Sequence, residues 1–186
     1  MPLTIGDKWL PATLTAPAMT DEEFAALCAS HPDLTFEVTA SGKLVVMRTS
    51  DAAFRKDKIR AQLEQWARSG TVRDSAMFQL RNGARRSPDV CWIASENAEG
   101  KPASPDFVIE LRSDRNRLPW LREKMFEWVD SGTRLVWMID PERKAVEILR
   151  PGRKPEVRSD VTSVEGEGPV AGFVLDLASV WASNGA

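Results

Sequence analysis

The sequence predicts a single α/β domain built on a mixed β-sheet flanked by helices. The chain has 186 residues, about the length of one domain with a single sizeable core. Hydrophobic residues make up 42% and charged residues 28%, as in ordinary globular proteins. Helical and alternating patterns follow one another as helix, hairpin, helix, strands, helix, strand, strand. We expect an N-terminal arm at 1–19, where three prolines stand with little periodicity, and one domain over 20–186.

The first half of the chain predicts two helices around a β-hairpin. The segment that begins at Thr20 (TDEE) has the pattern of a capping box, so a helix should start after it. Residues 34–39 alternate strictly, with apolar side chains on one face and Glu37 on the other, and 43–47 return as the second strand. A second helix is expected over 52–69, because its apolar residues recur at helical spacing before a glycine.

The second half of the chain predicts most of the sheet and a third helix. From composition and apolar content, strands are expected at 71–81, 84–93, 107–111, 135–139 and 145–150. A helix with one apolar face is expected at 118–131, and Gly132 should end it. The most apolar strand, 135–139, is expected near the centre of the sheet. The tail from 151 is rich in turn residues, with a weak helix near 175–181.

The scarcity of three residue types limits the chemistry of the chain, which has one His, two Cys and no Tyr. Common zinc sites need several Cys or His ligands, whereas only Cys28, His31 and Cys91 are present. A Ser-His-acid or Cys-His site would have to use His31, which precedes Pro32 in an expected loop. An enzyme with this sequence must therefore work mainly with carboxylates, Lys and Arg.

Charge and hydropathy give no general evidence for a nucleic-acid or membrane partner. The chain has 25 basic and 27 acidic residues, for a net charge of −2. No apolar run approaches the ~20 residues of a spanning helix, and the N-terminus does not read as a signal peptide. Two cysteines that look unpaired favour a reducing compartment. We therefore expect a cytoplasmic protein with no membrane partner.

Three acidic residues, Glu37, Asp89 and Glu110, stand in unusual places. Glu110 interrupts the apolar strand FVIEL, and strand alternation places it on the same face as Arg112. Asp89 and Glu110 on neighbouring strands, with Arg112 beside them, could hold Mg²⁺ through carboxylate oxygens. The alternative is an ion pair between Glu110 and Arg112 at a sheet edge, with Asp89 as a turn residue after Pro88. The pattern alone favours that alternative.

Lys124 lies on the flank of the expected helix at 118–131. At ~100° per residue it stands about 80° from the centre of the apolar face. From that flank its side chain could reach along the sheet toward Glu110. The more frequent outcome at such a position is a lysine whose stem packs on the core and whose ammonium extends into water.

Four motifs resemble a known family when they are taken together in this order. They are MTDEEFAALCASHPDLTFEVTASGKLVVM, RSPDV, FVIELRSDRN and LREKMFEWVDSGTRLVWMIDP. They resemble the Uma two family of proposed endonucleases, in the restriction-endonuclease-like PD-(D/E)XK superfamily, from about Thr20 to Trp181. The resemblance implies a restriction-endonuclease-like central mixed sheet flanked by helices. It also implies a metal-dependent endonuclease that hydrolyses phosphodiester bonds of DNA with Mg²⁺ or Mn²⁺.

The resemblance assigns roles to individual residues. Glu37 matches the acid ahead of the hairpin turn, Asp89 matches the Asp of the Pro-Asp motif, and Glu110 matches the acid of the following strand. These three are the implied metal ligands, and Lys124 matches a helical lysine that would stabilise phosphate. All four are the implied catalytic residues. The superfamily often has Lys two residues after the strand acid, where this chain has Arg112.

Three groups of basic residues could form a phosphate-binding rim around this acidic centre. The groups are Arg48, Arg55, Lys56, Lys58 and Arg60; Arg81, Arg85 and Arg86; and Arg112, Arg115, Arg117, Arg122 and Lys124. Arg112, Arg86 and Lys56 are the candidate phosphate ligands, and the alternative is a solvated surface of mixed charge. A rival function is a nuclease-like domain that has lost catalysis and serves as a nucleic-acid-binding or assembly module. The superfamily resemblance also suggests a homodimer.

Overall fold

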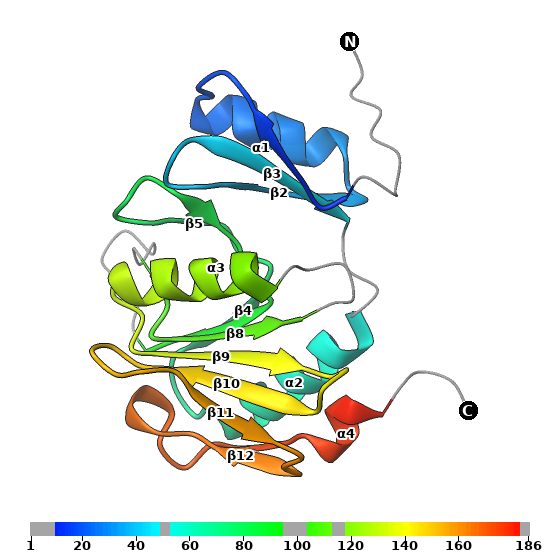
Figure 1. The fold of residues 1–186 in the computed structure, drawn as a ribbon, viewed down its shortest axis with the longest axis vertical. Coiled ribbons are helices and arrows are strands. Elements are labelled where there is room, and N and C mark those ends of the chain that lie inside the picture. Colours follow the sequence, from blue (N-terminus) through cyan, green and yellow to red (C-terminus); the bar gives the residue numbers. More distant parts are fainter. Residues whose placement is uncertain (1–9, 49–52, 95–103, 113–117, 183–186) are drawn as a thin grey trace.

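The computed structural model of the chain describes residues 10–48, 53–94, 104–112 and 118–182. Two sheets follow one another along the long axis of the molecule, and helix α3 (Leu118–Asp130) lies between them (Figure 1). Helix α1 (Asp21–Ser30) covers the far side of the first sheet, and helix α2 (Ala53–Trp66) covers the far side of the second. This arrangement confirms the expected mixed α/β architecture with flanking helices.

The first sheet has five strands in the order β1-β3-β2-β6-β5, and all its pairings are antiparallel. Its strands are β1 (Ala12–Thr15), β2 (Leu34–Val38), β3 (Lys43–Arg48), β5 (Phe78–Gln79) and β6 (Arg85–Arg86). The capping box is formed, because Thr20 accepts from the amide of Glu23 while the Glu23 carboxylate accepts from the amide of Thr20. Phe36 is buried toward α1, whereas Glu37 points to the opposite face, as strand alternation requires.

The second sheet has six strands in the order β11-β10-β9-β8-β7-β4. Its strands are β4 (Thr71–Asp74), β7 (Val90–Ile93), β8 (Phe107–Leu111), β9 (Leu135–Asp140), β10 (Ala145–Leu149) and β11 (Glu156–Ser159). Only β8 and β9 are parallel, and α3 makes the crossover that a parallel pair needs. The most apolar strand, β9, lies inside this sheet, as its composition predicted.

Both faces of the six-stranded sheet are apolar. Ile109 and Trp137 point to the face covered by α2, the β12–β13 pair and α4 (Ala178–Trp181), whereas Val108 and Met138 point to α3. The β12–β13 pair consists of Ser163–Glu165 and Val174–Asp176, and the short helix η2 (Gly168–Val170) lies between its strands. Because side chains alternate along β8, Glu110 faces α3 together with Val108. The fold therefore places the Glu110 carboxylate among the apolar residues under α3.

The structure differs from the sequence prediction in four segments. Residues 12–15, predicted as part of an arm, form strand β1 on β3, and residues 1–9 lie outside the described part of the chain. The strand predicted at 71–81 is broken at Ser75, whose φ of 49° turns the chain from one sheet to the other. The strand predicted at 84–93 is likewise divided by Pro88, since proline cannot donate to a ladder. The tail holds three short strands that its turn-rich sequence did not indicate.

Candidate nuclease site

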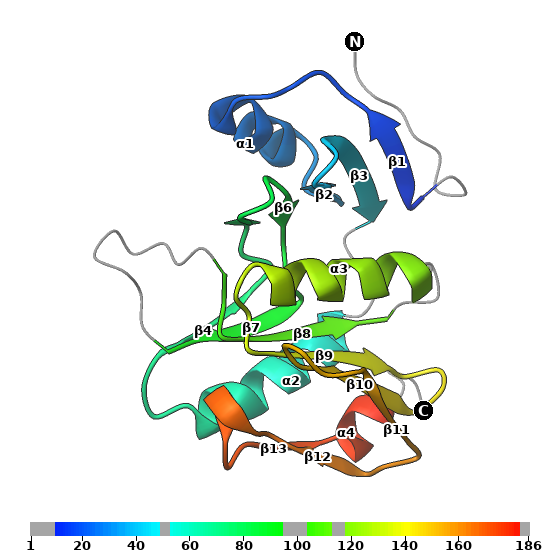
Figure 2. The same cartoon turned by 60° about the vertical axis from the view of Figure 1, so that its left-hand side comes forward.

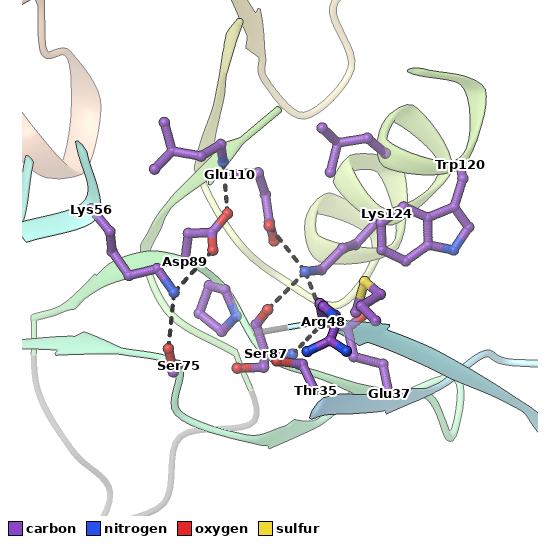
Figure 3. Close-up of a pocket in the computed structure, with 14 residues that line it drawn as sticks. Thr35, Glu37, Arg48, Lys56, Ser75, Ser87, Asp89, Glu110, Trp120 and Lys124 are labelled. Atoms are coloured by element: carbon purple, nitrogen blue, oxygen red, sulfur yellow. Dashed lines mark hydrogen bonds and ion pairs between the residues drawn. The ribbon is translucent and has the colours of Figure 1, made fainter. Parts of the chain in front are cut away.

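A pocket opens where the inner face of the five-stranded sheet meets α3 and the ends of β7 and β8 (Figure 3). The five-stranded sheet contributes Thr35, Glu37, Met47 and Arg48, and the remaining wall is formed by Lys56, Ser75, Ser87, Pro88, Asp89, Glu110, Leu111, Trp120, Leu121 and Lys124. Charged side chains from both sheets and from two helices therefore converge on one cavity.

Glu110 is a buried carboxylate, with a relative exposure of 1%. Its Oε2 accepts a hydrogen bond from the Lys124 ammonium at 2.9 Å, and its Oε1 accepts one from the Trp128 indole at 2.8 Å. Burial raises the pKa of Glu110 to about 7, because removal from water penalises the charged form, and the nearby Lys124 opposes that rise. The carboxylate thus combines a perturbed pKa with a specific cationic partner, as active-site acids often do.

Lys124 connects the two sheets. Its Nζ lies 2.9 Å from Glu110 Oε2, 2.8 Å from Glu37 Oε1 and 2.7 Å from the carbonyl oxygen of Ser87. Burial penalises the ammonium, but the two carboxylates outweigh this effect and hold the pKa of Lys124 above its ordinary value. An ammonium has three N–H donors, so these three acceptors use all of them.

Glu37 is fully buried and has donors on both oxygens. Its Oε1 accepts from the Ser87 amide at 3.1 Å as well as from Lys124, and its Oε2 accepts from Arg86 at 3.0 Å. Arg86 in turn reaches Glu127 of α3 with an Nε–Oε2 distance of 2.5 Å. Glu37 and Arg86 therefore belong to a buried charge network that joins β2, β6 and α3.

Asp89 is more accessible than Glu110, with a side-chain exposure of 23%. Its Oδ2 accepts from the Leu111 amide at 2.7 Å, which fixes the carboxylate beside the end of β8. Its Oδ1 lies 3.2 Å from Lys56 Nζ, and Lys56 also donates to the Ser75 hydroxyl at 3.1 Å (Figure 3). The pocket thus holds, besides Glu37, one carboxylate in β8 and one just before β7, each with a lysine beside it.

Comparison with known proteins gives the family and the fold of the chain. The family model of Uma2, described as "Putative restriction endonuclease", matches residues 21–178. The chain belongs to the Uma2 family. A crystal structure from Anabaena variabilis ATCC 29413, described as "a putative nuclease belonging to DUF820", has the same fold with a TM-score of 0.72. It is 17% identical, and the match covers 88% of this chain and 98% of that one. No curated protein matches the sequence.

Uma2 membership and the shared fold confirm the resemblance that the motifs indicated, and they support a nuclease. The family also suggests nucleic acid as the class of substrate. In the described part of the chain, no helix has both the length and the apolar character needed to cross a bilayer.

The structure brings together the four residues that the Uma2 motifs single out, since Glu37, Asp89, Glu110 and Lys124 all line the pocket. The alternative ion pair between Glu110 and Arg112 is not formed. Lys124 is also 4% exposed, so it does not extend into water as a surface lysine would. Lys124 donates a hydrogen bond to Glu110, as expected from its place on the helix.

Two of the three predicted phosphate ligands are not placed to contact phosphate. Arg86 is 1% exposed and lies between Glu37 and Glu127, so its guanidinium is enclosed by carboxylates. Arg112 does not line the pocket, and its guanidinium binds Asp140 at 2.5 Å on the neighbouring strand. Only Lys56 of the three reaches the pocket.

The first predicted basic group reaches the pocket only in part: Arg48 and Lys56 line it, and its other three members do not. Arg55 donates to the carbonyl of Val180, and Lys58 donates to the carbonyl of Ser179, each at 3.0 Å. Arg60 is engaged by acidic side chains of its own helix and of β4. These side chains attach the C-terminal segment or pair locally, and local sequence pattern cannot show such partners. Arg115 and Arg117 lie outside the described residues.

Sequence reasoning missed the groups that hold the acidic residues in place. Ser87 contacts Glu37 through its amide and Lys124 through its carbonyl, and Ser75 supports Lys56. No side-chain pattern marks these two serines. Trp128 could have been found, because it stands four residues after Lys124 and therefore on the same helix face.

The donor set of the pocket suits a hard divalent cation, but the three-carboxylate set is not assembled. Among the described residues, no three acidic, His or Cys side chains are close enough to hold one ion. Glu37 is the most enclosed of the three acids: it is 0% exposed and has three donors, from Arg86, Ser87 and Lys124, against two each for Asp89 and Glu110. Mg²⁺ typically takes one or two carboxylates and completes its shell with water and substrate phosphate. Asp89 and Glu110 fit that requirement.

Proposed function

We propose that this Uma2 protein is a metal-dependent nuclease that hydrolyses phosphodiester bonds of DNA, with Mg²⁺ or Mn²⁺ held by Asp89 and Glu110. The observation that carries the proposal is the convergence of these two carboxylates and Lys124 on one pocket. They come from three separate elements, β8, α3 and the segment before β7. A composition that excludes chemistry based on His and Cys leaves this group as the best-equipped site in the described chain.

The roles of the residues follow from their surroundings. A bound Mg²⁺ or Mn²⁺ would lower the pKa of a coordinated water and neutralise phosphate charge. Asp89 supplies the more accessible carboxylate, which the Leu111 amide orients. Glu110 supplies the buried carboxylate, which must be ionised to act as a ligand. Lys56, 17% exposed and beside Asp89, is the lysine better placed to meet a substrate phosphate.

Lys124 contributes positive charge at the buried end of the pocket. Its three donors are engaged, so direct contact with phosphate requires it to exchange one of its protein acceptors. Without such an exchange it still holds Glu110 and Glu37 in fixed positions. In both cases a neutral residue at 124 would leave the buried Glu110 carboxylate without its cation and Glu37 with Arg86 alone.

One observation favours a second candidate function. Each carboxylate oxygen of Glu110 and Asp89 already has a donor within the protein. Such closed hydrogen bonding also suits a nuclease-like domain that binds nucleic acid or assembles with other proteins without cutting. The two candidates differ in one measurable property, which is cleavage that depends on Asp89 and Glu110.

The decisive experiment is nicking of supercoiled plasmid in Mg²⁺ or Mn²⁺ by the purified protein. Asp89→Asn and Glu110→Gln should each reduce cleavage by at least about 100-fold, because each removes a charged ligand. Glu147→Gln is the matched control, since Glu147 is a buried carboxylate paired with Arg122 away from the pocket. Cleavage that persists in the two site variants would identify contaminating nuclease, and DNA binding without cleavage would favour the second candidate.

We also propose a homodimer for cleavage of both strands, because one pocket acts on one strand at a time and a two-fold dimer supplies two equivalent sites. Sedimentation velocity with and without a short duplex tests this. A protein that stays monomeric on DNA and produces only nicks would contradict the dimer while leaving the nuclease intact.

A further inference from the structure

The Trp128 indole makes a directed contact with the proposed metal ligand. Trp128 is fully buried on α3, and its Nε1 donates to Glu110 Oε1 at 2.8 Å. Its ring also packs edge-on against Phe78 at a centroid distance of 5.8 Å, which restrains the indole from the other side. The donor is therefore fixed by packing and is not free to follow the carboxylate.

Packing alone does not bring an indole N–H to an acceptor in this protein. Trp137 is equally buried, yet its Nε1 has no hydrogen-bond partner among the described residues. Trp137 belongs to β9 and points to the face of the six-stranded sheet that is turned away from α3. There it packs in an aromatic cluster with Phe107 and Phe173. The two tryptophans thus differ in one respect that matters here, which is the hydrogen bond to Glu110.

One helix holds both oxygens of the Glu110 carboxylate. Lys124 and Trp128 are four residues apart on α3, so their side chains point to the same side. Lys124 engages Oε2 and Trp128 engages Oε1. The terminal torsion of a glutamate is soft, so a carboxylate held by only one donor can rotate. Two donors from one rigid helix fix its plane.

We infer that Trp128 is a positioning residue that orients Glu110 so that Oε2 faces the pocket and a divalent cation. The inference rests on the proposed function, since it concerns the same site. Hydrogen-bond partners of metal ligands typically change metal affinity by 10- to 100-fold when they are removed. Loss of the indole N–H should therefore weaken metal binding, even where the fold is retained.

The test is calorimetric titration of the full chain with Mn²⁺ alone. Trp128→Phe should bind Mn²⁺ about tenfold more weakly than the wild type. Trp137→Phe is the matched control, because it removes the same ring volume from an equally buried site without removing a hydrogen bond. Its Mn²⁺ affinity should equal that of the wild type. Equal affinities for all three proteins would overturn the inference.

A second variant separates the hydrogen bond from the ring volume if Trp128→Phe does not fold. Replacing Trp128 with 3-benzothienylalanine exchanges the N–H for sulfur and keeps the bicyclic shape. This protein should also lose about tenfold in Mn²⁺ affinity. Wild-type affinity in it would show that the indole only fills space, and the positioning role would be wrong.

Indole N–H resonances give a readout that does not depend on activity. During titration of ¹⁵N-labelled protein with Mg²⁺, the Trp128 signal should shift with the same saturation as the calorimetric binding, while the Trp137 signal stays in place. A stationary Trp128 signal would contradict the inference. If the wild type binds Mn²⁺ and cleaves DNA while the Trp128 variants are normal, only the positioning role fails. If the wild type binds no metal, the proposed function fails and the inference with it.

Discussion

The two sheets of this molecule bury their side chains in different ways. The six-stranded sheet is apolar on both faces, against α3 on one side and against α2 with the C-terminal segment on the other (Figure 2). The five-stranded sheet is apolar mainly toward α1, and its inner face presents the buried charges Glu37 and Arg86 to α3. The contact between the sheets therefore combines these charges with apolar packing of Phe78, Leu80 and Ala84 against α3, and the candidate site occupies its charged part.

The charged inner face of the five-stranded sheet explains why charged residues are tolerated in the interior. A buried charge is tolerated when it is paired and hydrogen-bonded, and Glu37, Arg86 and Lys124 each have partners from at least two elements. A contact that was hydrophobic throughout would seal the pocket, whereas the charged part of this contact leaves polar groups at its edge. The same network therefore joins the sheets and supplies the proposed chemistry.

The largest expected effect on stability comes from breaking the buried charge network between the five-stranded sheet and α3. Arg86→Met should lower the free energy of unfolding by about 3 kcal/mol, because Glu37 and Glu127 lose their buried cation. Urea denaturation followed by circular dichroism measures this. Arg85→Met is the adjacent control and should cost no more than about 1 kcal/mol, since its partner Asp21 is exposed. Equal losses in the two variants would contradict a structural role for the buried network.

Amide hydrogen exchange should show directly that the two sheets differ in local stability. Amides of β2 and β3 should exchange at least about tenfold faster than those of β8 and β9, because the five-stranded sheet has the smaller apolar core. Native-state exchange read by NMR gives both sets in one sample. Identical protection would show that the molecule opens only as a whole, and the proposed contrast between the sheets would then be wrong.

The reactivity of the two cysteines also measures the difference in stability between the two sheets. Burial raises the pKa of Cys91 in β7 to about 12, and it also raises the pKa of the half-buried Cys28 in α1. At about pH 8 a small thiol reagent should modify Cys28 first and Cys91 only after unfolding. Rapid modification of Cys91 in the native protein would mean that the six-stranded sheet opens more readily than its core implies.

The Cys91 thiol also makes stability depend on pH. An unfolded thiol ionises near its ordinary value of 9.0, below the folded value, so the unfolded chain releases its proton first. The contribution is therefore fully present below about pH 9 and declines as pH rises toward about 12. Urea midpoints should fall over that range more steeply for the wild type than for Cys91→Ala. Parallel curves would contradict the buried, protonated thiol.

The smallest expected effects distinguish two lysines of α2. Lys58→Ala should cost about 1 kcal/mol of stability, because Lys58 binds the Ser179 carbonyl, and it should leave DNA affinity unchanged. Lys56→Ala should weaken DNA binding and reduce the slope of log affinity against log salt by about 0.9, the value of one phosphate contact. Fluorescence anisotropy at several salt concentrations measures both. Equal slopes in the two variants would remove Lys56 from the proposed site.

Local pattern was enough to locate the main elements and the unusual acids. The capping box at Thr20, the alternation of β2 and the apolar stripe of α3 depend on neighbours within a few residues, so each is readable from sequence. The short strands of the tail were missed because three or four residues of mixed polarity carry little periodicity. The division of 71–81 depends on a single backbone angle at Ser75.

The sequence by itself determined the types of residue available for chemistry and the strand positions of two acids. Glu37 lies opposite the apolar face of its strand, and Glu110 interrupts an apolar strand. Only the tertiary structure decided which cation each acid meets. Lys124 and Arg86 became buried partners, whereas Lys58 binds a carbonyl 121 residues away in the chain. Periodicity records which side of an element faces inward. It carries no information on which distant group lies opposite, and that choice sets the charge, the burial and the pKa of each side chain in the site.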